Sequence, residues 1–149
     1  VGPMAAVAGA IAEFVGKELL KYSGQLIIEN GGDIFIKTDK ERTIMIYAGD
    51  SPLSNKVFIK IKPEDMPAGV CTSSGTVGHS LSFGKADACV IIAQSAVLAD
   101  AVATAACNRI KEKKDIAPSL EFAISIKGVR GAIAILGKNL GSMGNVELV

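Results

Sequence analysis

The sequence predicts an α+β fold in which a mostly antiparallel sheet packs with two long helices. Short apolar or alternating runs, typical of strands, are separated by Gly, Asn, Asp and Pro. Two longer segments instead carry apolar residues at helical spacing. The chain has 149 residues, of which 49% are hydrophobic, so we expect a single domain over residues 1–149 with a large core or a sizeable interface.

The first helix is predicted over residues 3–22. Pro3 suits a first helical position, and Met4, Val7 and Ile11 follow at helical spacing. Only Ala and Gly separate these apolar residues, so another backbone can pack closely against this half of the helix. The second helix is predicted over residues 96–113, with Ser95 as its N-cap.

Eight strands are predicted between and after these helices. Four of them form an antiparallel meander over residues 25–29, 33–37, 43–47 and 57–61. A continuously apolar run over residues 87–93 is typical of a buried strand. The last three are predicted over residues 121–127, 130–136 and 146–149, with Gly128 and Gly137 in turns.

Composition argues against nucleic-acid and membrane partners. The formal net charge is +1 and aromatic residues make up 5% of the chain, so neither a basic surface nor base-stacking side chains are offered. No apolar run reaches the about 18 to 20 residues of a membrane-spanning helix. Cys71, Cys89 and Cys107 are odd in number and far apart, which argues against a disulfide framework and favours the reducing cytoplasm.

Three clusters of small and polar residues interrupt this apolar sequence, and the first is Asn30-Gly31-Gly32-Asp33. On one interpretation it is a hairpin turn, since Asn-Gly and Gly-Gly tolerate positive φ. On the other, Gly31 and Gly32 expose backbone N–H groups to a ligand, while Asp33 binds a ligand hydroxyl or amide.

The second cluster runs from Thr72 to His79 and holds four hydroxyl groups, two glycines and the one histidine of the chain. It is either a structured loop or an anion-binding nest in which His79 acts as acid, base or phosphate contact. The candidate nest residues are Ser73, Ser74, Gly75 and Thr76. The phosphate-loop pattern GxxxxGK[ST] and the nucleophile elbow GxSxG are both absent from the sequence.

The third cluster lies on the second predicted helix, where Asp100, Thr104 and Asn108 are four residues apart and form one stripe. A polar stripe ordinarily faces solvent. Alanines surround this one, however, and a carboxylate and a hydroxyl one turn apart suit Mg²⁺ when phosphates and backbone carbonyls complete its coordination.

In this order, the three clusters resemble those of the ApbE family of flavin transferases and its short ApbE-like relatives. Asn30-Gly31-Gly32-Asp33 resembles the GGD segment of that family, and Thr72-Ser73-Ser74-Gly75 resembles its TSG segment. Residues 99–105 resemble its ADA-x-AT metal segment. The stretch from His79 to Gly84 resembles a degraded form of its H-I-x-D-P-x-T-G stretch.

The resemblance implies an α+β fold that binds a nucleotide-type ligand, FAD or FMN, together with Mg²⁺. It implies that Asp100, Thr104 and the backbone near Ala5 hold the metal, and that His79 or Asp100 assists proton transfer. Family members split FAD and attach FMN to a threonine of a partner protein, or hydrolyse FAD. The implied nucleotide-binding residues are Gly31, Gly32, Asp33, Ser73, Ser74, Gly75 and Thr76.

Two alternatives stay open beside this function. Ala6 and Ser82 stand where the family has Lys and Asp, which favours a binding or assembly protein that kept the fold without the chemistry. Family association also suggests a role in sulfur transfer toward homocysteine, in which Cys71 would act. Because the chain starts at Val1 without the N-terminal part of the family, we expect that segment, or homo-oligomerisation, to complete it.

Overall fold

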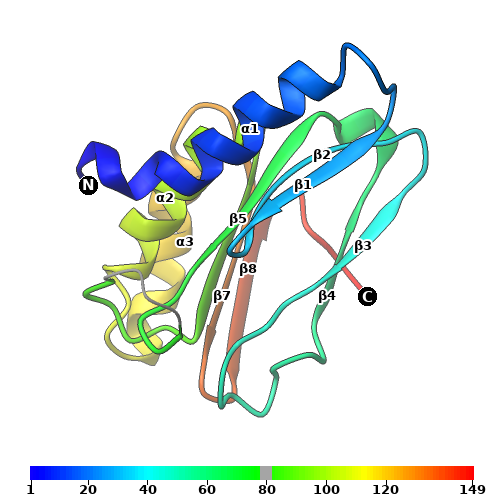
Figure 1. Cartoon of the computed structure of the whole chain (residues 1–149). Helices are drawn as coiled ribbons and strands as arrows, with labels where there is room; N and C mark the ends of the chain where they lie inside the picture. The colour runs from blue at the N-terminus through cyan, green and yellow to red at the C-terminus, as the bar shows by residue number, and fades with distance from the viewer. Residues whose placement is uncertain (78–81) are drawn as a thin grey trace.

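The computed structural model describes residues 1–77 and 82–149, with helices on one face of a large sheet and a second, smaller sheet on the other (Figure 1). The large sheet has the order β1-β2-β5-β6-β7-β8 and the small sheet the order β3-β4-β9. Every pairing among the described strands is antiparallel, which confirms the predicted fold class. The strands are β1 Leu26–Asn30, β2 Asp33–Lys37, β3 Arg42–Met45, β4 Phe58–Ile61, β5 Ala68–Ser73, β6 Ala88–Ala93, β7 Val129–Leu136, β8 Asn139–Gly144 and β9 Glu147–Leu148.

Three α-helices and three short 3₁₀ helices accompany these strands in the described residues. The α-helices are α1 Val7–Leu19, α2 Ala96–Cys107 and α3 Ile116–Ile124. The 3₁₀ helices are η1 Pro3–Ala6, η2 Pro63–Asp65 and η3 Lys113–Asp115. None of the helices in this part of the chain combines the length and apolarity that crossing a membrane demands.

The large sheet separates two apolar cores, and β6 shows how. All six of its residues are buried, as predicted for a strand in this segment. Cys89 and Ile91 pack toward the helices, whereas Val90 and Ile92 pack toward the small sheet. Because successive side chains of a strand point to opposite faces, each core receives every second residue.

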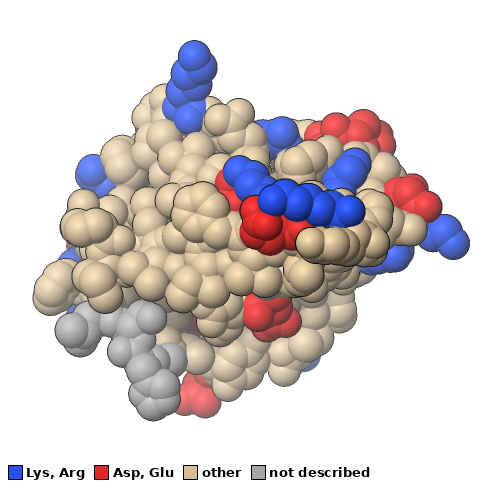
Figure 2. Space-filling model, turned by 45° about the horizontal axis from the view of Figure 1, so that its top comes forward, with Lys and Arg blue, Asp and Glu red and all other residues tan. Residues whose placement is uncertain are grey.

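Helix α1 packs on the sheet through its small residues. Gly9, Ala12 and Gly16 are buried, and a Cβ on Gly16 would collide with the ring of Phe35. The large apolar residues at helical spacing face outward instead, with Phe14 63% exposed. Figure 2 looks onto this side of the molecule, where charged side chains gather over one part and a broad tan surface without charge extends beside them. The exposed set comprises Met4, Val7, Ile11, Phe14, Val15 and Leu19.

The prediction of a strand over residues 121–127 is wrong, because helix α3 covers most of this segment. Ile116, Leu120 and Ala123 are buried at helical spacing, and they pack against β7 and β8. This period outweighs the local alternation on which the strand was predicted. The fold therefore has a third α-helix, of nine residues, in addition to the two predicted ones.

The predicted meander is also wrong, because β1–β2 and β3–β4 form hairpins in two different sheets. Strands β5 and β8 were not predicted. Both are poor in the branched and aromatic residues typical of strands, and the sequence of β5 is AGVCTS. The first helix is divided into η1 and α1, and the second ends at Cys107 rather than near residue 113. Gly128 and Gly137 have positive φ in turns, as predicted.

Candidate functional site

Helices α1 and α2 cross in close contact where Gly9 meets Asp100. The backbone N–H of Gly9 donates a hydrogen bond of 2.9 Å to Oδ2 of Asp100. A Cβ on Gly9 would lie 2.8 Å from the Cβ of Asp100 and would also collide with the carbonyl oxygen of Ala96. Gly9 belongs to the first turn of α1, whose N–H groups lack helical acceptors, so the carboxylate of Asp100 caps α1 from a different helix.

Asp33 is the first residue of β2 and lies close to Asp100 of this crossing. It pairs with Cys71 of β5 and is only 7% exposed. Among the described residues its Oδ1 is the one buried side-chain oxygen or nitrogen without a hydrogen-bond partner. Burial raises the pKa of Asp33 to about 7, the negative charge of Asp100 adds to the rise, and the thiol of Cys71 and the N–H of Thr72 oppose it.

Asp100 is the second buried carboxylate of the site, at 9% exposure. Burial raises its pKa, and the N–H of Gly9 opposes the rise. Two carboxyl groups that each resist ionisation therefore share one low-dielectric region. A cation between or beside them would relieve both, which is the electrostatic condition that a metal site meets.

Cys71 completes this group without offering a reactive thiol. Its Sγ donates a hydrogen bond of 3.3 Å to the carbonyl oxygen of Ala96, and it is fully buried. Burial raises the pKa of the thiol, and the charges of Asp33 and Asp100 raise it further. A thiol held in its neutral form is a poor nucleophile, so the structure gives the sulfur-transfer alternative no support and that role stays a prediction.

The Asn30-Gly31-Gly32-Asp33 segment is the turn between β1 and β2, in which Asn30 pairs with Asp33. Gly31 and Gly32 have φ of +62° and +96°, as the hairpin interpretation predicts. The side-chain amide of Asn30 donates a hydrogen bond of 3.3 Å to the carbonyl oxygen of Ala8, which ties the turn to the start of α1. A Cβ on either glycine would meet no atom within 4 Å, so both face open space beside the site.

The loop after β5 uses its polar groups internally. Oγ of Ser74 accepts hydrogen bonds from the backbone N–H groups of Thr76, at 3.0 Å, and Val77, at 2.9 Å. The N–H of Gly75 donates to Ala86, and Oγ1 of Thr76 donates to a carboxylate oxygen of Asp87 at 3.0 Å. The N–H groups that an anion-binding nest would need already donate hydrogen bonds within the protein, as the structured-loop interpretation expects.

Ser73 and Thr76 point in different directions. Ser73 lies near Cys107 of α2, on the helix side of the sheet, where its hydroxyl lowers the pKa that burial raises for that thiol. Thr76 instead lines a separate hollow of about 360 Å³ together with Tyr47, Asp50 and other residues of the loop after β3. Of the predicted nucleotide-binding residues, Asp33 and Ser73 thus lie near side chains of α2, namely Asp100 and Cys107.

The polar stripe of α2 contacts α1 at one end and the segment around Ser82 at the other. Asp100 faces α1, and half-buried Thr104 follows one turn later. Oδ1 of Asn108 accepts hydrogen bonds from Oγ of Ser82, at 3.0 Å, and from the N–H of Phe83, at 2.7 Å. Ser82, which the resemblance sets where that family has an aspartate, therefore anchors the chain to the end of α2. His79 lies outside the described residues.

The metal set implied by the resemblance is brought together only in part. Ala5 belongs to η1, which packs against α2, the helix that carries Asp100 and Thr104. Across residues 1–77 and 82–149, no three His, Cys, Asp or Glu side chains are grouped closely enough to hold a metal ion. A metal here would need the Thr104 hydroxyl, backbone oxygens or the ligand itself.

Glu13 was not predicted from the sequence as a site residue. Glu13 is 4% exposed, and its Oε2 accepts hydrogen bonds from Oγ of Ser95, at 2.6 Å, and from the N–H of Val97, at 3.2 Å. Burial raises the pKa of Glu13, but the bonds from Lys17, Ser95 and Val97 outweigh burial and lower it overall. The signal was available, because Glu13 shares the face of Gly9 and Gly16 that small residues mark as buried.

Comparison with known proteins identifies the family of this chain. The chain matches the family model described as "AbpE bacteria" over residues 1–138. It is 47% identical to a UPF0280 protein of Methanococcus aeolicus, covering 98% of this chain and 61% of that protein. It is 45% identical to a UPF0280 protein of Methanocaldococcus jannaschii, covering 100% of this chain and 63% of that protein. The chain thus spans about three fifths of the length of these curated relatives.

Two solved structures share the fold at low sequence identity. The ApbE protein of Thermotoga maritima superposes with a TM-score of 0.68 at 18% identity, over 92% of this chain and 49% of that one. The apo flavinyl transferase ApbE of Pseudomonas stutzeri superposes with a TM-score of 0.61 at 16% identity, over 94% and 47%. With the family model matched over residues 1–138, the chain belongs to the family described as "AbpE bacteria" and has an ApbE fold.

Proposed function

We propose that this protein binds a flavin nucleotide or another phosphorylated ligand together with Mg²⁺, at the crossing of α1 and α2. The proposed metal ligands are Asp100, Thr104 and a backbone carbonyl near Ala5, with Asp33 close to Asp100. FAD is the first nucleotide to test, because one structural relative is named as a flavinyl transferase. Splitting of FAD with transfer of FMN is the reaction that this proposal favours.

One observation carries the proposal: a buried carboxylate oxygen of Asp33 has no partner and lies near a second buried carboxylate, Asp100. Burying a carboxylate oxygen without a partner destabilises a fold, so the presence of this one favours a group that binds it. Two nearby glycines support the same interpretation, since Gly31 and Gly32 face open space and expose their backbone on this side. The donor set, carboxylate and hydroxyl oxygens, is the one that Mg²⁺ prefers.

The proposed chemistry divides between the metal and the chain. Bound Mg²⁺ would polarise a pyrophosphate and neutralise the leaving phosphate. Asp100 would orient the α1 backbone through the Gly9 N–H while presenting its other oxygen to the ligand. Asp33, with a pKa of about 7, would exchange a proton in the physiological range, and we propose His79 as a further proton donor or acceptor.

Titration with FAD in the presence of Mg²⁺ tests this proposal, with native mass spectrometry to detect any nucleotide retained through purification. Asp33→Ala and Thr104→Val should each weaken FAD binding by about tenfold or more. Thr43→Val, on an exposed strand position, is the matched control and should bind as the wild type does. Equal affinity in all four proteins, or no FAD binding at all, would contradict the proposal.

A second candidate function is a binding or assembly protein without catalysis. It is favoured by the hydrogen bonds that already occupy the site: Asp100 caps α1, Ser74 closes its own loop and Ser82 anchors to Asn108. Under this alternative the purified protein retains or binds nucleotide but leaves FAD intact. Chromatographic analysis of FAD after prolonged incubation separates the two functions.

The outward apolar face of α1, formed by Met4, Val7, Ile11, Phe14, Val15 and Leu19, belongs to the same proposal. Contiguous exposed apolar surface of this kind is typical of an interface. We propose that a second copy of the chain, or the further length that the relatives possess, covers it. The three buried free cysteines are compatible with the cytoplasm as the site of this function.

A further inference from the structure

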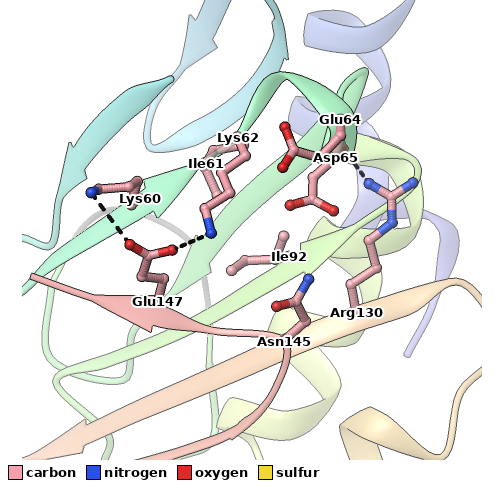
Figure 3. Close-up of a pocket in the computed structure, with 9 residues that line it drawn as sticks. All are labelled: Lys60, Ile61, Lys62, Glu64, Asp65, Ile92, Arg130, Asn145 and Glu147. Carbon is pink, nitrogen blue, oxygen red and sulfur yellow. Dashed lines mark hydrogen bonds and ion pairs between the residues drawn. The ribbon is translucent and has the colours of Figure 1, made fainter. Parts of the chain in front are cut away.

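A second hollow lies on the opposite face of the large sheet from the α1–α2 crossing, where the small sheet meets η2 and β7 (Figure 3). Its volume is about 230 Å³. Ile61 and Ile92, both buried, supply its apolar lining. Its charged lining consists of Lys60, Lys62, Arg130, Glu64, Asp65 and Glu147.

A β-bulge directs Arg130 toward this hollow. Gly131 pairs with Ile92 and Val129 pairs with Ala93, so Arg130 is the extra residue on β7. The bulge is held in place, because the N–H of Asn145 donates a hydrogen bond of 2.7 Å to the carbonyl oxygen of Arg130. Bulges re-aim side chains and are common beside functional sites, so the hollow has a structural basis beyond loose packing.

The charges around the hollow are divided into satisfied and free groups. Glu147 pairs with both lysines, at 3.3 Å to Lys60 and 2.7 Å to Lys62. The guanidinium of Arg130 donates to the backbone carbonyl of Asp65 rather than to a carboxylate. Within residues 1–77 and 82–149, neither Glu64 nor Asp65 forms an ion pair.

Figure 3 shows how these groups converge. The carboxylate of Asp65 and the amide of Asn145 point toward one another across Ile92. The ammonium of Lys62 lies on one side and the guanidinium of Arg130 on the other. An open carboxylate therefore faces one small hollow together with Arg130, Lys62 and Asn145. Arg130 and Lys62 each keep N–H groups beyond the bonds that they make to Asp65 and Glu147.

From this arrangement we infer that the hollow binds a small zwitterion of the α-amino acid class. The ammonium group of the ligand binds Asp65, its carboxylate binds the free donors of Arg130, Lys62 or Asn145, and a short apolar side chain packs on Ile92. A planar guanidinium is well suited to a carboxylate, and charge-assisted hydrogen bonds are the strong ones. This ligand is independent of the nucleotide proposed above.

The balance of charge favours a zwitterion over a simple ion. The three cationic and three anionic side chains around the hollow sum to zero formal charge. Free Glu64 and Asp65 repel an inorganic anion, while Lys62 and Arg130 repel a metal cation. Only a ligand with both charges gains from both sets, and a hollow smaller than the about 300 Å³ of a drug-sized site limits its size.

Titration of isotope-labelled protein with L-valine, followed by amide NMR, tests the inference. The expected result is saturable shifts of the amide signals of Ile92 and Asn145. The carboxylate-only analogue 3-methylbutanoate and the amine-only analogue isobutylamine should each bind at least about tenfold more weakly, since each forfeits one charge-assisted contact. Inorganic phosphate should cause no saturable shift in the same signals.

Asp65→Asn should weaken L-valine binding by about tenfold and leave 3-methylbutanoate binding unchanged. Lys62→Gln, at the N-cap of η2, is a second variant and should weaken the binding of both L-valine and 3-methylbutanoate. Asp39→Asn, at an exposed position, is the matched control and should behave as the wild type does. The inference is overturned by equal binding of L-valine and either half-analogue, by tighter binding of phosphate, or by no shifts with any probe. FAD binding is read separately, so its failure does not touch this result.

Discussion

The carboxylate of Asp100 caps the first turn of α1 through the backbone N–H of Gly9, at 2.9 Å, across 91 positions of sequence. The contact requires glycine, because any side chain would collide with Asp100 and with the Ala96 carbonyl. It fixes where α1 begins relative to α2. The position of the proposed metal ligands thus depends on a glycine that no ligand touches.

Gly9→Ala should therefore harm both stability and ligand binding. The added methyl group forces α1 away from α2, and such overpacking typically costs about 1–3 kcal/mol. Chemical denaturation measures the loss. Gly24→Ala is the matched control, since a Cβ there meets no atom within 4 Å. Unchanged stability of Gly9→Ala would show that the two helices are not held this closely.

Ser95→Ala should destabilise the start of α2. Oγ of Ser95 accepts a hydrogen bond from the N–H of Leu98 and donates one to buried Glu13. Removing such a cap costs about 1 kcal/mol, and here it also deprives Glu13 of a partner. In a double-mutant cycle, Glu13→Gln and Ser95→Ala should be less than additive in their free energies of unfolding. Strict additivity would mean that the two side chains do not interact.

The pKa of Asp33 predicts that stability falls as pH rises. Because its pKa is about 7 in the folded protein against 3.8 ordinarily, the folded state holds this proton more tightly. The resulting stability is fully present below about pH 4 and is lost as pH rises through about 7, a loss of at most about 4 kcal/mol. Thermal unfolding across this range measures it. Asp33→Asn should reduce this dependence, leaving the part that the raised pKa of Asp100 contributes, and should be more stable than the wild type at pH 8. Asp39→Asn should keep the full dependence.

The apolar face of α1 should hold two chains together, or bind further chain. Phe14→Ser removes a side chain that is 63% exposed, and it should shift sedimentation from dimer toward monomer without lowering the free energy of unfolding of each chain. Met45→Ser, at 51% exposure on the small sheet, is the control. A wild-type chain that sediments as a stable monomer at all concentrations would exclude the dimer.

Local sequence patterns correctly predicted three features that depend on neighbouring residues alone: a turn, a buried strand and a helix cap. The hairpin at Gly31 and Gly32, the buried strand β6 and the cap at Ser95 follow from residue type and spacing. The strands β5 and β8 do not, because their small residues acquire strand structure only from neighbours already in the sheet.

The orientation of α1 shows a second limit. Periodicity identifies an apolar stripe, and burial of that stripe is the ordinary expectation. In this protein the small face is buried because a close approach to Phe35 and Asp100 replaces side-chain packing. Glu13 is buried on the same face for the same reason, so its role could not be inferred from charge alone.

In the candidate site, too, some features follow from local sequence and others depend on distant contacts. Asp33 and Asp100 lie close enough for the charge of Asp100 to raise the pKa of Asp33, whereas Thr76 lines a different hollow. Which face of a loop a hydroxyl occupies depends on bonds to distant residues, such as that of Thr76 to Asp87. Sequence spacing carries no information about such bonds.

If Asp100 holds a metal needed for nucleotide binding, the affinity for FAD depends on both Mg²⁺ and the Asp100 carboxylate. FAD is titrated into the wild type and into Asp100→Asn, each with Mg²⁺ and with a chelator. Asn can still accept the Gly9 N–H, so equal thermal stability of the two proteins shows that the cap survives. Tight binding is expected only for the wild type with Mg²⁺, with affinities lower by about tenfold or more in the other three titrations. Identical FAD affinity in all four titrations would show that Asp100 holds no such metal.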